Sequence, residues 1–299
     1  MSVSNSNIGR RAAPAWRERL ATYVRLVRLN RPIGIFLLMW PALWAVWLAG
    51  EGAPPWSVVV IFVLGVVFMR SAGCAINDFA DRDFDGQVAR TKARPIAAGE
   101  VTPGEAVAVF GVLVLMAFGL VLFLNWQTVL LSIVALVLAV IYPFMKRFTH
   151  LPQVFLGAAF GWAIPMAFMA IREEIPGFAW LLFIATVIWA LIYDTQYAMV
   201  DRDDDRKVGI KSTAILFGRY DLLAIGLLQA VMLGLLLVIA RMAQLGSAFY
   251  VGLAVAGGLA IYQHYLTRHR EPAACFKAFL NNNYFGMAIF IGLVIDYQV

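Results

Sequence analysis

Long runs of uncharged, apolar residues are the feature that most constrains how this chain can fold. The longest covers 40 residues, from Ala106 to Met145, and contains no Asp, Glu, Lys, Arg or His. A helix needs about 20 apolar residues to cross the hydrocarbon core of a bilayer, so this run predicts two spans that fold back at 125–127. Only 14% of the residues are charged, whereas soluble domains average about 25%. The sequence therefore predicts an all-α membrane protein.

The same criterion of about 20 apolar residues per crossing predicts nine transmembrane helices in total. The other seven are expected over Ile33–Gly50, about Trp56–Phe79, Leu151–Ile171, about Phe178–Val200, Leu222–Ala240, Met242–Gln263 at most, and about Ala278–Ile295. A weak internal repeat relates the first four helices to the next four, because acids end the second helix of each set and a basic loop follows. We therefore expect two parallel four-helix halves plus one helix around a central cavity. Residues 1–31 are interpreted as a cytoplasmic N-terminal tail and residues 32–299 as a single domain.

Lys and Arg are distributed unevenly between the two ends of the expected helices. If the N-terminus lies in the cytoplasm, 21 of the 24 Lys and Arg residues fall in cytoplasmic segments. An excess of these residues marks cytoplasmic loops. The sequence thus predicts a cytoplasmic N-terminus, with both acidic stretches described next at cytoplasmic helix ends.

Two acidic stretches each place polar side chains on one face of a helix. Residues four, seven, eight or eleven apart stack along the same helical face. Solvated helix ends are the plain alternative, but solvation does not require the same face to repeat in two places. The two sets are Asn77, Asp81 and Asp85 in the first stretch, and Asp194, Asp201 and Asp205 in the second.

Crowded carboxylates raise one another's pKa values unless solvent or cations compensate them. Oxygen ligands without a His or Cys cluster select a hard ion, Mg²⁺ or Mn²⁺, and Mg²⁺ is commonly shared between carboxylates and substrate phosphates. Basic side chains nearby suit the remaining phosphate oxygens. The sequence therefore predicts a diphosphate ligand whose lipid tail lies in the apolar bundle. The candidate diphosphate-binding residues are Arg90, Lys92, Arg94, Arg206, Lys207 and Lys211.

One basic residue, Arg70, falls inside a predicted span. An Arg at the centre of a membrane helix costs roughly 2.5–3.5 kcal/mol on insertion scales, so we expect it to have a partner. Its spacing places it on the same helical face as Asn77 and Asp81. Two interpretations stay open at this point: a structural ion pair with Asp194, or a contact with a carboxylate of a second substrate.

The acidic stretches resemble the two motifs of the UbiA superfamily of intramembrane aromatic prenyltransferases. They read NDFADRDFD at 77–85 and DTQYAMVDRDDD at 194–205. The segments LVRLNRPIG, YPFMKRFTHLPQ and GIKSTAILFG are also similar to the branch that acts on 4-hydroxybenzoate, and the resemblance covers about residues 20–296. It implies transfer of a polyprenyl group from polyprenyl diphosphate to the carbon ortho to the hydroxyl of 4-hydroxybenzoate. It also implies a role in ubiquinone biosynthesis, in the inner membrane of a bacterium.

The resemblance further implies Mg²⁺ as cofactor and assigns roles to residues. Asp194 and Tyr197 match the extended second motif, and Arg147 matches a basic position associated with the aromatic acid. The residues that would hold metal and diphosphate are Asn77 and the four catalytic carboxylates Asp81, Asp85, Asp201 and Asp205.

Other functions compete with this one. Within the same class, the acceptor could be another quinone precursor, or haem. From a different class, parallel repeats with intramembrane Asp and Arg also suit a cation-coupled transporter. A transporter would place its ionisable groups near the middle of the membrane, whereas here they gather at one end beside basic loops. The net charge of +6 does not imply nucleic-acid binding.

Overall fold

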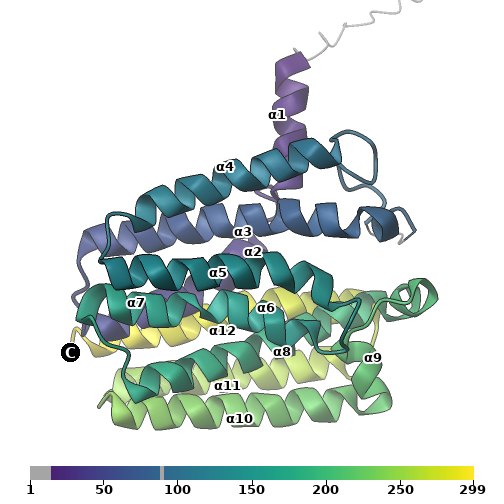
Figure 1. Cartoon of the computed structure of the whole chain (residues 1–299). Coiled ribbons are helices and arrows are strands. Elements are labelled where there is room, and N and C mark those ends of the chain that lie inside the picture. The colour runs from purple at the N-terminus through teal and green to yellow at the C-terminus, as the bar shows by residue number, and fades with distance from the viewer. Residues whose placement is uncertain (1–14, 88–90) are drawn as a thin grey trace, which may run out of the picture.

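The computed structural model describes residues 15–87 and 91–299, and all regular structure in this part of the chain is helical (Figure 1). The predicted all-α class is therefore confirmed. A single 3₁₀ turn, Gly218–Tyr220, joins α9 to α10. In chain order the helices are α1 (Ala15–Leu26), α2 (Ile33–Ala49), α3 (Trp56–Asp85), α4 (Pro103–Val121), α5 (Trp126–Met145), α6 (Pro152–Gly161), α7 (Ala163–Arg172), α8 (Gly177–Val208), α9 (Thr213–Phe217), α10 (Asp221–Met242), α11 (Ser247–Thr267) and α12 (Pro272–Asp296).

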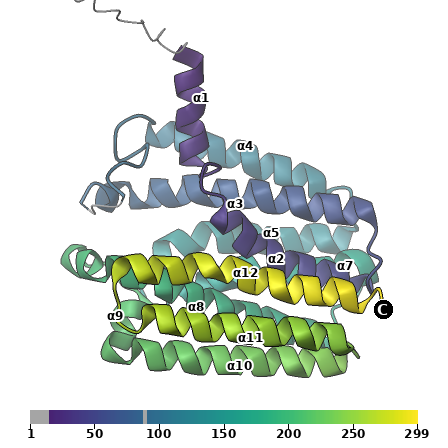
Figure 2. The same cartoon turned by 180° about the vertical axis from the view of Figure 1, so that it is seen from behind.

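The long helices lie side by side in one bundle, and α1 runs crosswise to them and projects beyond its edge (Figures 1 and 2). Every predicted apolar run is helical. Within the described residues, seven helical segments are long and apolar enough to cross a membrane, and the apolar α2 is shorter. The chain is thus a multi-pass membrane protein.

Both helices that carry acidic stretches continue past the ends predicted from hydropathy. The helix expected to end near Phe79 runs to Asp85, and the one expected to end near Val200 runs to Val208. Gly209 ends α8 in a left-handed conformation, with φ of 74°, which glycine adopts without steric cost. Apolar residues mark where a helix leaves the membrane, whereas the cap decides where it stops.

The span predicted over Leu151–Ile171 is two helices, α6 and α7, divided at Trp162. Pro165 lies in the first turn of α7 and has no N–H to donate to the carbonyl of Gly161. A missing i→i−4 bond of this kind breaks or kinks a helix.

Two other helices begin away from their predicted starts. The helix expected over Met242–Gln263 is α11, Ser247–Thr267, and the one expected from about Ala278 begins at Pro272. Proline is favoured at the first helical position because its missing N–H would have no partner there.

Polar side chains cap the starts of two helices. Thr102 caps α4 through a reciprocal pair of bonds with Glu105, and Asn125 accepts a bond of 2.9 Å from the backbone N–H of Thr128 at the start of α5. Such caps satisfy N–H groups that have no partner within the helix. The described residues between α3 and α4 form turns, as expected for the basic loop.

Three consecutive asparagines fasten α12 to three other helices. Side-chain bonds of 2.8–3.2 Å cross from this run to α2, α8 and α11. In a membrane, interhelical bonds of this kind hold helices in register. The bonds join Asn281 to Gln263, Asn282 to Gln196, and Asn283 to Trp40.

Candidate active site

A cavity of about 680 Å³ opens among helices α2 to α8, and α12 also lines it. Along α3 its wall is apolar from Ile61 to Met69 and becomes polar from Arg70 to Asn77 and Asp78. Side chains of α4 and α5 continue the apolar part. The other polar residues lining it are Arg25, Arg28, Asn30, Arg31, Arg70, Thr91, Arg94, Ser132, Tyr142, Tyr193, Asp194 and Tyr197.

The first acidic stretch is organised around Arg94, which comes from the loop before α4. Its Nη1 lies 2.8 Å from Oδ2 of Asp85, 3.3 Å from Oδ1 of Asp78 and 3.6 Å from Oδ2 of Asp81. All three carboxylates are buried. Burial raises the pKa of Asp85, and the nearby guanidinium of Arg94 opposes that shift. Asp78, Asp81 and Asp85, together with the Arg94 that joins them, are called the carboxylate cluster below.

Two further cations reach the carboxylate cluster from other segments. Lys146, which follows α5, pairs with Asp81, and Arg28 Nη2 lies 2.6 Å from Asp78 Oδ1. Burial alone would lower the pKa of Arg28, but nearby negative groups, Asp78 foremost through its charge and its hydrogen bond, together raise that pKa. The acids are therefore compensated by three basic side chains of the protein, an arrangement that was not predicted from the sequence.

The oxygen donors of the cluster suit a magnesium ion in chemical type. Asn77 Nδ2 donates to Asp81 Oδ2 at 3.0 Å, and Asp78 Oδ2 is buried with no hydrogen-bond partner in the part of the chain described. Among residues 15–87 and 91–299, no three or more His, Cys, Asp or Glu side chains form a group able to hold a metal alone. Mg²⁺ commonly takes only one or two carboxylates and completes its shell with water and substrate phosphates. The residues present therefore fit a metal shared with a substrate.

The second acidic stretch approaches the cavity only through its earlier residues. Asp194 and Tyr197 line the cavity wall, whereas Asp201 and Asp205 lie half-buried on the last turns of α8. The cavity walls, so far as the described residues show, do not include these last two acids.

Of the six predicted diphosphate-binding residues, Arg90 lies outside the described residues and only Arg94 of the other five lines the cavity. Arg206 and Lys92 are exposed. Lys207 is also exposed and pairs with Asp204 at 3.0 Å, and Lys211 Nζ donates to the carbonyl of Phe148 at 3.2 Å. Hence four residues of this set stand away from the cavity.

Arg70 lies at the cavity wall beneath the cluster. Its Nη1 donates to Cys74 Sγ at 2.6 Å, and its guanidinium stands 5.9 Å from the ring centre of Phe160. The Nε is buried and has no hydrogen-bond partner among the described residues. A Cβ at Gly34 would collide with this guanidinium, so glycine there makes room for it. Arg147 instead donates to the carbonyl of Ala80.

Aromatic rings form the α8–α12 side of the polar end. Tyr197 lies with its ring centre 4.7 Å from that of Phe279 and 6.2 Å from that of Phe276. All three line the cavity. Aromatic faces attract cations within about 6 Å of the ring centre, so this wall suits a substrate that develops positive charge.

The model of the UbiA prenyltransferase family matches residues 38–290. The chain belongs to the UbiA prenyltransferase family. It is 59% identical over 281 residues to a 4-hydroxybenzoate octaprenyltransferase of Methylococcus capsulatus, covering 94% of this chain and 96% of that protein. A 4-hydroxybenzoate octaprenyltransferase of Pectobacterium carotovorum is 61% identical over 273 residues, with 91% and 95% covered.

Solved structures share the fold of this prenyltransferase. The apo structure of a UbiA homologue from Aeropyrum pernix K1 has a TM-score of 0.77 at 26% identity and covers 87% of this chain and 97% of that one. A UbiA homologue from Archaeoglobus fulgidus bound to GPP and Mg²⁺ has a TM-score of 0.67 at 20% identity, with 90% and 99% covered.

Three residues of the prenyltransferase site escaped the sequence analysis. Arg28 was counted with the tail, Asp78 was given no role, and Lys146 was overlooked. One signal was available: Arg25, Arg28 and Arg31 follow one another at intervals of three, and all three line the cavity.

Proposed function

We propose that this prenyltransferase transfers a polyprenyl group from polyprenyl diphosphate to the carbon ortho to the hydroxyl of 4-hydroxybenzoate, in ubiquinone biosynthesis. One observation carries the proposal: an apolar cavity that ends at the buried carboxylate cluster and its cations. Leu115, Phe118 and Ile133 line this cavity and are also exposed on α4 and α5. The cavity therefore reaches the lipid-facing surface, as a lipid-tailed substrate requires.

Each group of residues has a role that suits its chemistry. Arg94 and Arg28 face phosphate oxygens through charge-assisted bonds, and the rings of Tyr197, Phe276 and Phe279 stabilise the allylic cation and exclude water. When bound there, Mg²⁺ would supply positive charge opposite the departing diphosphate. The residues that would hold it are Asn77, Asp81, Asp85, Asp201 and Asp205.

The direct test uses the purified protein, Mg²⁺, a polyprenyl diphosphate and a panel of aromatic acids. We expect one prenylated product, formed from 4-hydroxybenzoate, and its loss when EDTA removes the metal. Reactions without donor serve as the control. Prenylation of another quinone precursor or of haem would show that the acceptor is not 4-hydroxybenzoate. Metal-independent transfer would contradict the proposed cofactor. Cation flux in proteoliposomes without any transfer would favour a transporter.

We further propose nine spans in two parallel four-helix halves plus one, with α2 and α11 completing the set. The N-terminus and the carboxylate cluster would lie on the cytoplasmic side of a bacterial inner membrane. The unequal distribution of Lys and Arg supports this orientation.

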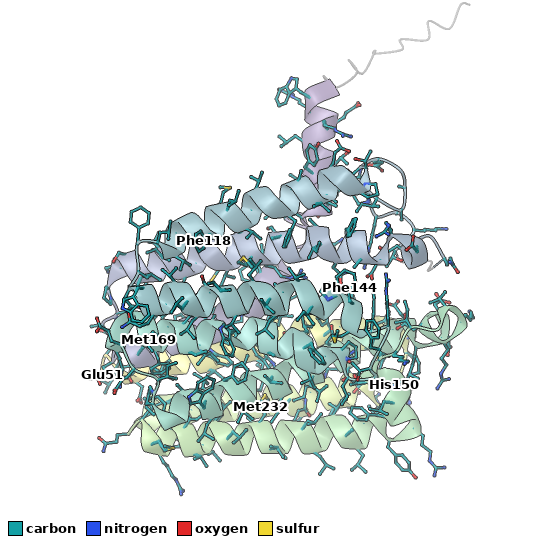
Figure 3. All side chains as sticks on the ribbon, in the orientation of Figure 1. Glu51, Phe118, Phe144, His150, Met169 and Met232 are labelled. Carbon is teal, nitrogen blue, oxygen red and sulfur yellow. The ribbon has the colours of Figure 1, made fainter. Side chains whose placement is uncertain are left out.

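Cysteine labelling tests the orientation. Glu51 and His150 are both exposed and lie at opposite ends of the bundle (Figure 3). In a background lacking Cys74 and Cys275, we expect an impermeant maleimide to label E51C in intact cells and H150C only after permeabilisation. The reverse pattern would invert the topology.

Replacing Arg70 by Leu distinguishes its two interpretations. If Arg70 binds the acceptor, the KM for 4-hydroxybenzoate should rise while the KM for the prenyl donor and the thermal stability stay unchanged. If it forms an ion pair with Asp194, the variant should instead lose stability, and adding Asp194→Asn should restore part of it. Arg241 is exposed in the last turn of α10, so R241L serves as the control. A variant unchanged in stability and in both KM values would refute both interpretations.

A further inference from the structure

The N-terminal helix α1 is built differently from every helix around it. It runs crosswise to the long helices in both views of the fold (Figures 1 and 2). When the long helices stand across a bilayer, a crosswise helix lies along the membrane plane. Arg19 fixes the position of α1 along the membrane normal. It donates to the carbonyl of Glu100 at 2.7 Å and pairs with Glu105 in the first turn of α4. That turn begins a membrane-spanning segment, so α1 lies at the membrane surface.

The sequence of α1 divides it lengthwise into an apolar and a polar face. At 100° per residue, Trp16, Leu20, Tyr23, Val24 and Val27 fall within an arc of about 100°. This pattern extends over the whole helix and one residue beyond its end.

Polar residues occupy the opposite face of α1. Glu18 lies about 160° around the helix from Leu20, and Thr22 and Arg25 lie beside Glu18. Thr22 and Arg25 contact Glu100, at 3.3 Å for Thr22.

Among residues 15–87 and 91–299, the protein covers only the inner half of α1. Leu26 is buried against Ala75, Val101 and Ala106, which belong to α3, the loop before α4, and α4 itself. Farther out, Trp16 and Leu20 are 63% and 55% exposed.

Arg17 stands next to the exposed apolar face. Its guanidinium lies 5.2 Å from the ring centre of Trp16. Tryptophan with flanking arginine is typical of helices that lie in the headgroup region, where the ring is apolar and the charge reaches phosphates.

We propose that α1 binds the surface of the bilayer spanned by the bundle, with Trp16 and Leu20 at the boundary between headgroups and acyl chains. Its inner end leads directly to Arg28, which contacts the carboxylate cluster through Asp78. Lipid contact at the outer end therefore fixes the segment that supplies this cation. The proposed lipid contact itself does not depend on the reaction assigned to the cavity.

Spin labels on the full-length protein in lipid nanodiscs test the proposal. Leu20→Cys and its control Glu18→Cys are placed on the same turn but on opposite faces, in a chain whose buried Cys74 and Cys275 are replaced by Ala. Collisions with oxygen and with a water-soluble nickel complex report the depth of each nitroxide. We expect the label at 20 to lie about 5–10 Å below the headgroup level, and the label at 18 to be open to the nickel complex.

A water-accessible label at position 20 would overturn the proposal. A label at 20 that neither quencher reaches would also overturn it, because protein, such as a second copy of this chain, would then cover the face. If the cysteine variants do not fold, the native chain can be tested with a lipid carrying a photoreactive acyl chain. Cross-links at residues 16–24 support lipid contact, and their absence while α3 and α4 are cross-linked contradicts it.

Discussion

Replacing Asp81 by Asn should lower kcat by at least about 10²–10³-fold, the usual effect of removing one group that stabilises transition-state charge. Asp81 is buried, pairs with Lys146, and lies 3.6 Å from Arg94. The amide keeps the size of the side chain but removes its charge. A metal shared with the diphosphate would then bind more weakly, and the two cations would face a neutral group.

Asp83→Asn is the matched control for this prediction. Its carboxylate lies on the same turn of α3 but is 64% exposed, and its contact with Arg82 is 3.8 Å, so the variant should turn over as the wild type does. Asp201→Asn should show a loss like that of D81N, since the second motif is proposed to hold the same ligand. Thermal unfolding of each variant separates lost folding from lost chemistry. Near wild-type turnover in both D81N and D201N would remove the basis for a metal-bound diphosphate.

Replacing Asp221 by Ala should lower the free energy of unfolding by about 3–5 kcal/mol, the cost of removing one partner of a buried ion pair. Asp221 is fully buried at the start of α10. It pairs with Arg202 of α8, and Arg270 Nη2, from the loop before α12, lies 2.7 Å from its Oδ1. It also accepts a bond of 2.7 Å from the backbone N–H of Leu222.

The second half of this prediction concerns the arginine that remains. Arg202 Nε is already buried without a hydrogen-bond partner in the part of the chain that is described, so without Asp221 its charge is left uncompensated. Adding Arg202→Met to D221A should therefore recover part of the lost stability. Asp204→Ala provides the control, because Asp204 is partly exposed and its partner Lys207 is exposed, and a surface pair of this kind contributes only about 0–1 kcal/mol. Unfolding of D221A at the wild-type temperature in detergent would contradict this role.

Features that depend on neighbours along the chain could be predicted from the sequence alone. Apolar runs of membrane length gave the helices, because each span must satisfy its own backbone hydrogen bonds in lipid. The caps at Thr102 and Asn125 are local features of the same kind, because a cap acts within three residues of itself. The stacked faces of the two acidic stretches followed from helical geometry, and their motifs identified the family.

Contacts between distant segments were decided only by the tertiary structure. Spacing showed that Asp81 and Asp85 share a face, but not that Arg94, Lys146 and Arg28 would meet it from three separate segments. Those segments meet because the helices pack in one particular arrangement, and no local pattern encodes which loops lie together.

Packing between distant segments also explains why the other predicted basic residues and the N-terminal segment differ from expectation. Arg206 and Lys207 look equivalent to Arg94 in sequence, yet they are exposed on the last turn of α8. Residues 15–26, interpreted as part of a tail, form a helix whose inner end is buried on α3 and α4. The sequence by itself determined which residues are charged and which face of a helix they share, whereas packing decided which charges are buried together, because burial depends on surfaces supplied by other helices.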